Sequence, residues 1–166
     1  GSTAVGRRIN EVGGRELKRV SLELGGKNAQ IVMDDANLDL ALDAVLWGAF
    51  GTTGQRCTAT SRLILHKDIH DKFLDMLVAR VNKLKLGYGN DKGVDVGPCV
   101  SKEQRETVND YVKIGLNEDK ATLIAGGDYA KDGSLAKGWF YKPTIFKDVT
   151  PDMRIAKEEI FGPVLA

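Results

Sequence analysis

The 166-residue sequence contains few of the residues on which several specialised protein classes depend. Two cysteines, Cys57 and Cys99, are too few for a disulfide framework, and neither lies in a C-x-x-C pair typical of a metal site. Only two histidines are present besides, so a zinc site has poor support. We therefore expect no bound metal and a reducing, cytoplasmic setting for the protein.

Charge of one sign and long hydrophobic runs are also missing. The 24 basic and 23 acidic residues nearly balance, which gives no electrostatic case for a nucleic-acid partner or a membrane surface. No apolar run approaches the ~20 residues that span a bilayer, and the opening residues do not resemble a signal peptide. We expect neither nucleic acid nor membrane among the partners.

The apolar residues that are present follow two kinds of spacing. Three- and four-residue steps predict helices over 3–13, 38–51, 69–84 and 101–116, the last with a capping box formed by Ser101 and Gln104. Short runs rich in β-branched and aromatic residues predict strands over 20–24, 29–33, 61–66, 121–125 and 140–146. Alternating strands and helices predict an α/β fold, a layered sheet with helices on both faces.

The strongest candidate for covalent chemistry is Cys57, which follows the glycine-broken turn at 51–54. A thiolate is a far better nucleophile than a thiol, so a reactive cysteine needs a base or a positive charge beside it. Glu23, in an otherwise apolar segment, is a candidate base for the thiol or for a hydrolytic water. Composition alone favours a plainer interpretation, in which Cys57 is a small core residue and Glu23 lies at a strand edge or in a salt bridge.

Four motifs in a fixed order resemble those of the aldehyde dehydrogenase superfamily. They are GSTAVGR (1–7), LELGGKN (22–28), GQRCTA (54–59) and EEIFGPV (158–164). The resemblance implies an aldehyde dehydrogenase-like catalytic domain that uses NAD or NADP and acts on a small-molecule aldehyde. It implies oxidation to a carboxylic acid through a cysteine thiohemiacetal and thioester, in a parent enzyme that is a homo-oligomer.

The same resemblance assigns roles to individual residues. Cys57 corresponds to the nucleophile, with its own backbone N–H as an oxyanion donor, and Glu23 corresponds to the general base. Burial of Glu23 beside its leucine neighbours would raise its pKa toward neutrality.

Cofactor binding is assigned by resemblance to five residues: Ser2, Leu24, Gly25, Glu159 and Phe161. Ser2 at a helix N-terminus would contact the pyrophosphate, although an ordinary helix cap explains it equally well. Gly25 would leave room for the nicotinamide ring, although a plain turn also suits it. Glu159 would bind a ribose, as acidic residues do elsewhere, and Phe161 would lie beside the nicotinamide.

Three residues beside these motifs have plainer interpretations. Cys99 is interpreted as a structural thiol and Lys27 as a structural ion-pair residue. Arg56, immediately before the nucleophile, is compatible with an acidic group on the substrate, with solvent exposure or with stabilisation of the thiolate.

The resemblance also predicts the domain organisation. Residues 1–19 correspond to the tail of a dinucleotide-binding domain, and residues 20–166 to a catalytic domain truncated at its C-terminus. We therefore expect a fragment with little or no dehydrogenase activity by itself. Two alternative functions remain open: a cofactor-independent cysteine esterase or acyl hydrolase, and a non-catalytic module.

Overall fold

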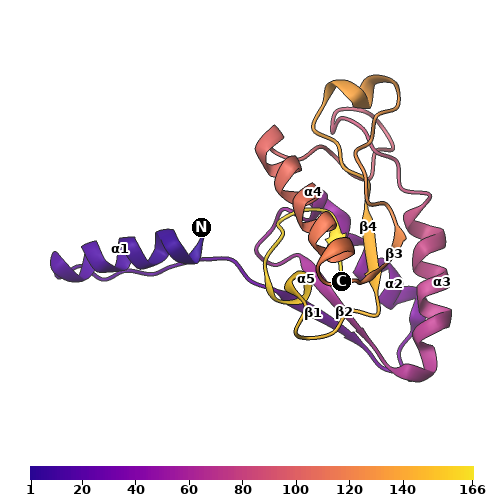
Figure 1. Cartoon of the computed structure of the whole chain (residues 1–166), viewed down its shortest axis with the longest axis horizontal. Coiled ribbons are helices and arrows are strands. Elements are labelled where there is room, and N and C mark those ends of the chain that lie inside the picture. The colour runs from indigo at the N-terminus through magenta and orange to yellow at the C-terminus, as the bar shows by residue number, and fades with distance from the viewer.

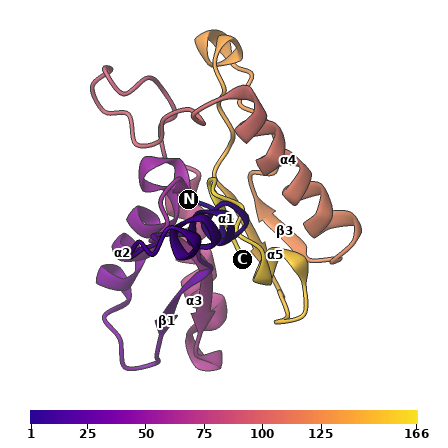
Figure 2. The same ribbon diagram turned by 90° about the vertical axis from the view of Figure 1, so that its left-hand side faces the viewer.

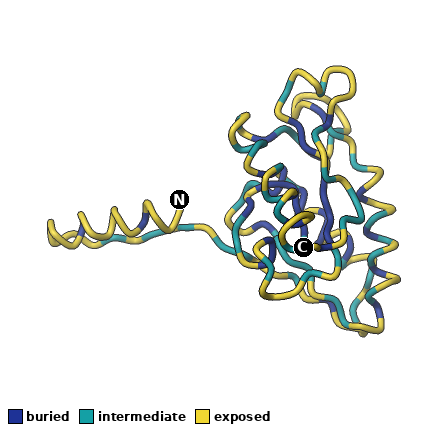
Figure 3. The backbone as a smooth tube through the Cα atoms, viewed as in Figure 1, coloured by how far each residue is buried: buried dark blue, intermediate teal, exposed yellow.

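An arm projects from one side of the protein in the computed structural model, which describes residues 1–166 (Figure 1). The arm consists of helix α1 (Thr3–Arg15) and the segment that follows it, which runs back along the helix toward the body. Ser2 caps the helix, because its Oγ accepts a hydrogen bond from the backbone N–H of Val5 at 3.4 Å. Most of the arm is exposed, as Figure 3 shows.

Two glycines allow the returning segment to lie close to α1. A Cβ at Gly6 would lie 2.9 Å from the side chain of Leu24, and a Cβ at Gly13 would overlap Val20. The strand predicted over 20–24 is therefore wrong: the segment is extended, but its apolar side chains pack on the helix and no neighbouring strand pairs with it.

Five strands form the central layer of the body. Strands β1 and β2 pair in parallel, β3 and β4 pair antiparallel, and β5 lies parallel to β4. Ala166, the residue after β5, bonds to β2: Leu63 N donates to Ala166 O at 2.8 Å and Ala166 N donates to Ser61 O at 3.1 Å. These bonds give the lateral order β1-β2-β5-β4-β3. The strands are β1 (Asn28–Val32), β2 (Thr60–Leu65), β3 (Thr122–Ala125), β4 (Thr144–Lys147) and β5 (Val164–Leu165).

Helices cover both faces of this layer (Figure 2). Adjacent residues of β4 and β5 face opposite cores, as the two-residue period of a strand requires. Ile145 and Leu165 are buried with α2 and α3, whereas Phe146 and Val164 are buried with α4 and α5. This arrangement confirms the α/β fold with helices on both faces. The helices are α2 (Leu38–Phe50), α3 (His70–Val81), α4 (Lys102–Asn117) and α5 (Arg154–Lys157), with short 3₁₀ turns η1 (Gly51–Gly54), η2 (Lys67–Ile69) and η3 (Gly133–Lys137).

The predicted helices are confirmed to within a few residues, but two local predictions need correction. The strand predicted over 140–146 forms only at Thr144–Lys147, after Pro143, which has no N–H to donate. The capping box is half formed: Ser101 Oγ accepts from Gln104 N at 3.2 Å, but the Gln104 side chain bonds elsewhere. No helix of the protein combines the length and the apolar character needed to cross a membrane.

Candidate active site

The loop that carries Cys57 begins with an unusual backbone turn. Helix α2 ends at Phe50, and Thr52, Thr53 and Gly54 then have positive φ values of 53°, 59° and 65°. Such values are strained for β-branched threonine, so the turn needs support from its surroundings. Buried Thr53 supplies part of it, because its Oγ1 donates to the carbonyl of Gly97 at 3.0 Å. Beyond the turn, Cys57 lies exposed at the surface.

The GQRCTA and EEIFGPV motifs touch each other directly through two glycines. A Cβ at Gly54 would overlap the carbonyl oxygen of Gly162 and lie 2.9 Å from that of Ala49. A Cβ at Gly162 would in turn overlap the side chain of Val108 on α4. The cysteine loop therefore rests on the backbone of the EEIFGPV segment, which rests on α4.

The LELGGKN motif meets both of these segments. Asn28 Nδ2 donates to the carbonyl of Cys57 at 2.6 Å and to that of Ala59 at 3.1 Å. The carboxylate of Glu159 lies so close to Gly25 that a Cβ there would overlap it. Residues of all three motifs line one small pocket, among them Gly26, Gly54 and Glu159.

The structure groups some of the predicted site residues more closely than others. Gly25, Glu159 and Phe161 lie around the pocket beside the Cys57 loop, with Phe161 partly exposed. Ser2, Glu23 and Leu24 belong to the arm, where the N-terminal ammonium of Gly1 donates to the carbonyl of Glu23 at 3.1 Å. Glu23 is exposed rather than buried, so the desolvation expected from its leucine neighbours is not present. The catalytic and cofactor roles of these residues stay predictions.

Two residues that support the site were missed by sequence reasoning. Gln104 Nε2 donates to the carbonyls of Ile160 at 3.0 Å and Phe161 at 2.9 Å, which holds Phe161 in a backbone conformation with φ of 57°. Its position three residues after Ser101 had indicated only a capping role. Asn28 lies within LELGGKN, but its bond to Cys57 spans 29 residues and has no local signal.

Burial shifts the pKa of two groups near the site. The pKa of Lys27 is lowered to about 8, chiefly by burial and secondly by the positive charge of Arg62. Its buried ammonium has no hydrogen-bond partner, so the ion pair predicted for Lys27 does not form. Burial raises the pKa of the Cys99 thiol to about 11, against a smaller opposing effect of Arg105. Cys99 is 2% exposed, as expected for a structural thiol.

The adjacent glutamates of the EEIFGPV motif have different surroundings. Glu158 accepts from Arg154 at 2.9 and 3.1 Å and from the hydroxyl of Tyr111 at 2.8 Å. The Arg154 bonds, and then that of Tyr111, lower the pKa of Glu158. Glu159 instead lines the pocket, where its carboxylate is available to a ligand.

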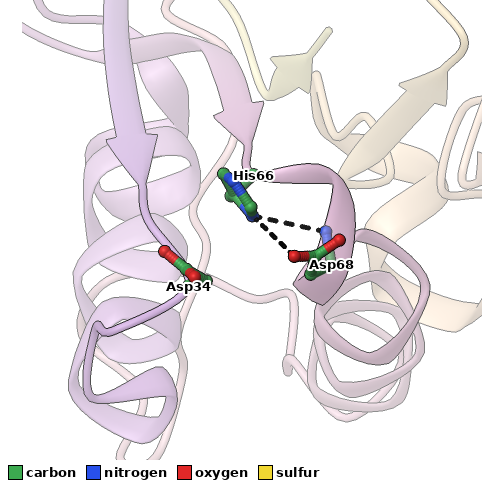
Figure 4. A group of neighbouring side chains, drawn as sticks. All are labelled: Asp34, His66 and Asp68. Carbon is green, nitrogen blue, oxygen red and sulfur yellow. Dashed lines mark hydrogen bonds and ion pairs between the residues drawn. The ribbon is translucent and has the colours of Figure 1, made fainter.

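A second cluster of polar side chains lies just after the C-terminal ends of β1 and β2, whereas the Cys57 loop lies near their N-terminal ends. One donor atom each from Asp34, His66 and Asp68 lies within 4.8 Å of the other two (Figure 4). His66 Nδ1 accepts from the backbone N–H of Asp68 at 3.4 Å and lies 3.7 Å from its carboxylate. This contact caps η2 and brings His66 and Asp68 together, whereas Asp34 makes no hydrogen bond or ion pair with either. Because β1 and β2 are parallel and start near Cys57, the group is separate from the cysteine loop.

Comparisons with known proteins identify the family of the chain. The family model described as "Aldehyde dehydrogenase family" matches residues 1–166. Betaine aldehyde dehydrogenase from Brucella ovis is 45% identical over 166 residues, covering 100% of this chain and 34% of the relative. The chain therefore spans about a third of the length of the curated relatives it matches.

Solved structures show the same similarity. Betaine aldehyde dehydrogenase from Staphylococcus aureus, determined in complex with NAD+, has a TM-score of 0.96 and 38% identity, covering 99% of this chain and 32% of that one. Aldehyde dehydrogenase from Bacillus cereus, as an E194S mutant, has a TM-score of 0.93 and 44% identity, covering 99% and 33%. A family match over every residue, together with these relatives, identifies the chain as a member of the aldehyde dehydrogenase family.

Proposed function

We propose that this chain carries the catalytic thiol of an enzyme that oxidises an aldehyde to a carboxylic acid with NAD or NADP. The observation that supports this most strongly is the meeting of three distant motifs around one loop. Asn28 holds the Cys57 carbonyl, Gly54 rests on Gly162, and Glu159 packs on Gly25. The arrangement leaves the nucleophile exposed on a fixed support, which suits attack on a small substrate.

Cys57 carries out the first step in this proposal. Its Sγ attacks the aldehyde carbon, and the new C–S bond gives a thiohemiacetal whose oxygen the Cys57 backbone N–H stabilises. Loss of hydride from that carbon, with loss of the hydroxyl proton, leaves a thioester on Cys57. Oxidation thus precedes the attack of water, and the two difficult events are separated.

Glu23 acts in the hydrolysis of the thioester. Its carboxylate removes a proton from the water that attacks the thioester, and the thiolate of Cys57 leaves as the carboxylic acid forms. The exposed position of Glu23 gives water free access to its carboxylate. A base at this position can also accept the thiol proton before the first attack.

Residues at the small pocket and at the start of α1 carry polar and aromatic groups that suit parts of a dinucleotide. Glu159 offers a half-buried carboxylate for ribose hydroxyls, and this carboxylate occupies the space that a side chain at Gly25 would fill. Phe161 offers a partly exposed ring, and the N-terminus of α1 at Ser2 offers backbone N–H groups for phosphate. When bound, the nicotinamide supplies the acceptor for hydride.

The setting of the parent enzyme is part of the same proposal. We place residues 1–19 in a dinucleotide-binding domain and residues 20–166 in the catalytic domain of a cytoplasmic homo-oligomer. The presence of only two cysteines supports the cytoplasmic setting. The outer side of β1 has no neighbouring strand and Ile31 on it is 64% exposed, which favours association with another polypeptide.

Formation of NADH tests the proposal. We expect the 166-residue chain, mixed with NAD+ and either propanal or betaine aldehyde, to turn over slowly, because the relatives it matches are about three times as long. Cys57→Ala should remove all of that signal, since the thioester cannot form without the thiol. The matched control is Cys99→Ala, which should keep it. NADH formation that persists at the original rate in Cys57→Ala would contradict the proposed chemistry.

A further inference from the structure

We infer that Arg56 is a positioning residue, which fastens the Cys57 loop to the end of α2, and that it does not bind an acidic substrate. Its guanidinium donates from Nη2 to the carbonyls of Trp47 at 3.2 Å and Gly48 at 3.4 Å. Both carbonyls belong to the last turn of α2; that of Trp47 also accepts from the backbone N–H of Gly51, so Arg56 adds a second donor to it. The helix dipole places negative charge at the same end, so a cation is favoured there.

The indole of Trp47 holds the other side of this contact. The Arg56 guanidinium carbon lies 4.0 Å from the centroid of the Trp47 ring, within the range of a cation–π interaction. The ring also lies over Gly51, where a Cβ would come within 3.5 Å of it. Trp47 is 67% exposed, so burial in the core does not explain its position. Its position is explained by the stacking of its ring on Arg56 and Gly51.

Arg56 is among the residues that line the small pocket beside Glu159, but these contacts engage its guanidinium. Its Nε is buried with no hydrogen-bond partner, which shows that the stem of the side chain is folded into the protein. A guanidinium that occupies two helix carbonyls and an indole face must leave all three before it can reach an anion elsewhere. Of the interpretations open from the sequence, these contacts argue against substrate binding and against a side chain free in solvent, and they assign Arg56 to the support of its neighbour Cys57.

Arg56 is one of several anchors, so its loss should not unfold the chain. Gln55 accepts from Val100 N at 2.9 Å and donates to Pro98 O at 3.4 Å, while Asn28 holds the carbonyl of Cys57. Each anchor reaches a different part of the body. Removal of the Arg56 anchor should loosen the peptide bond between Arg56 and Cys57 and leave the rest of the loop attached.

Limited digestion with trypsin measures how accessible the Arg56–Cys57 peptide bond is, because trypsin cleaves after arginine. We expect Trp47→Ala to increase the rate of cleavage after Arg56 about tenfold, relative to cleavage after Lys92 in an exposed loop of the same chain. The matched control is Trp139→Ala, which removes a partly exposed tryptophan whose ring lies 5.1 Å from Arg105 and should leave the ratio unchanged. An unchanged ratio in Trp47→Ala would overturn the inference.

A pair of alkylating reagents separates positioning from anion binding. Iodoacetate is negatively charged and iodoacetamide is neutral, so a substrate-binding cation would favour iodoacetate at Cys57. We expect the ratio of the two alkylation rates to stay within twofold in Arg56→Gln. A severalfold fall in that ratio would show that Arg56 attracts anions and would overturn the inference.

A kinetic measurement tests whether the anchor serves catalysis, and this part rests on the proposed function. With the neutral substrate p-nitrophenyl acetate, Trp47→Ala should lower the rate constant of the nitrophenol burst, which reports acylation of Cys57, about tenfold, because the loop that carries the thiol moves. An unchanged burst rate would make the contact merely structural and reject the positioning role. Failure of the proposed function looks different: the wild-type chain would then cleave the ester at the same rate as Cys57→Ala.

Discussion

Iodoacetamide at pH 7.5 should modify Cys57 at least a hundredfold faster than Cys99 in the folded chain. Cys57 is exposed, whereas Cys99 is 2% exposed and its pKa is raised to about 11 by burial. Because only the thiolate reacts, about 0.03% of Cys99 is reactive at this pH even before access is considered. The two peptides can be followed separately by mass spectrometry over time.

The pH dependence of the same labelling gives a check on its cause. The raised pKa means that the thiolate fraction of Cys99 should increase about tenfold for each pH unit up to about 11. Unfolding in urea should remove the difference between the two thiols, and Cys57→Ala should leave only slow labelling of Cys99. Equal labelling of both cysteines in the folded chain at pH 7.5 would contradict the exposed, supported position of Cys57.

Replacement of Gly54 by alanine should lower the free energy of unfolding by roughly 2–4 kcal/mol. Two costs combine: Gly54 has a φ of 65°, and a Cβ there would overlap the backbone carbonyl of Gly162. A backbone group cannot move aside as a flexible side chain can, so the cysteine loop must separate from the EEIFGPV segment. Urea unfolding followed by circular dichroism measures the loss.

Gly93 supplies a matched control for this substitution. It has a φ of 77°, but a Cβ there would meet nothing within 4 Å. Gly93→Ala should therefore show the conformational cost alone, about 1 kcal/mol. If both variants lose the same stability, the contact between Gly54 and Gly162 contributes nothing, and the two motifs are not held together in the way described.

The elements that sequence periodicity predicted well are those whose stability is local. Helices α2 and α4 have regular apolar spacing and side-chain caps at Asn37 and Ser101, and the structure places both within a few residues of the prediction. The strand prediction for residues 20–24 was wrong because an apolar run does not show whether it will pack against a strand or a helix. Here the partner is α1.

The candidate site depended far less on local pattern. The bond from Asn28 to Cys57 spans 29 residues, and that from Gln104 to Phe161 spans 57. No periodicity reports such contacts, so only the family resemblance placed the motifs in one site. Arg56 shows the opposite difficulty: its position beside the nucleophile suggested three roles, and its anchoring contacts on α2 were visible only in the structure.

The central claim is that the Cys57 thiol and the Glu23 carboxylate act in sequence on one substrate, and ester hydrolysis tests it most directly. With p-nitrophenyl acetate, acylation of the thiol releases nitrophenol in a burst, and hydrolysis of the thioester then sets the steady rate. Glu23→Gln should retain the burst but slow the steady rate at least tenfold, since the base for water is lost, a loss typical of about 10²–10⁴ for general bases. Cys57→Ser, as control, should lose the burst. A steady rate in Glu23→Gln equal to that of the wild-type chain would contradict the claim.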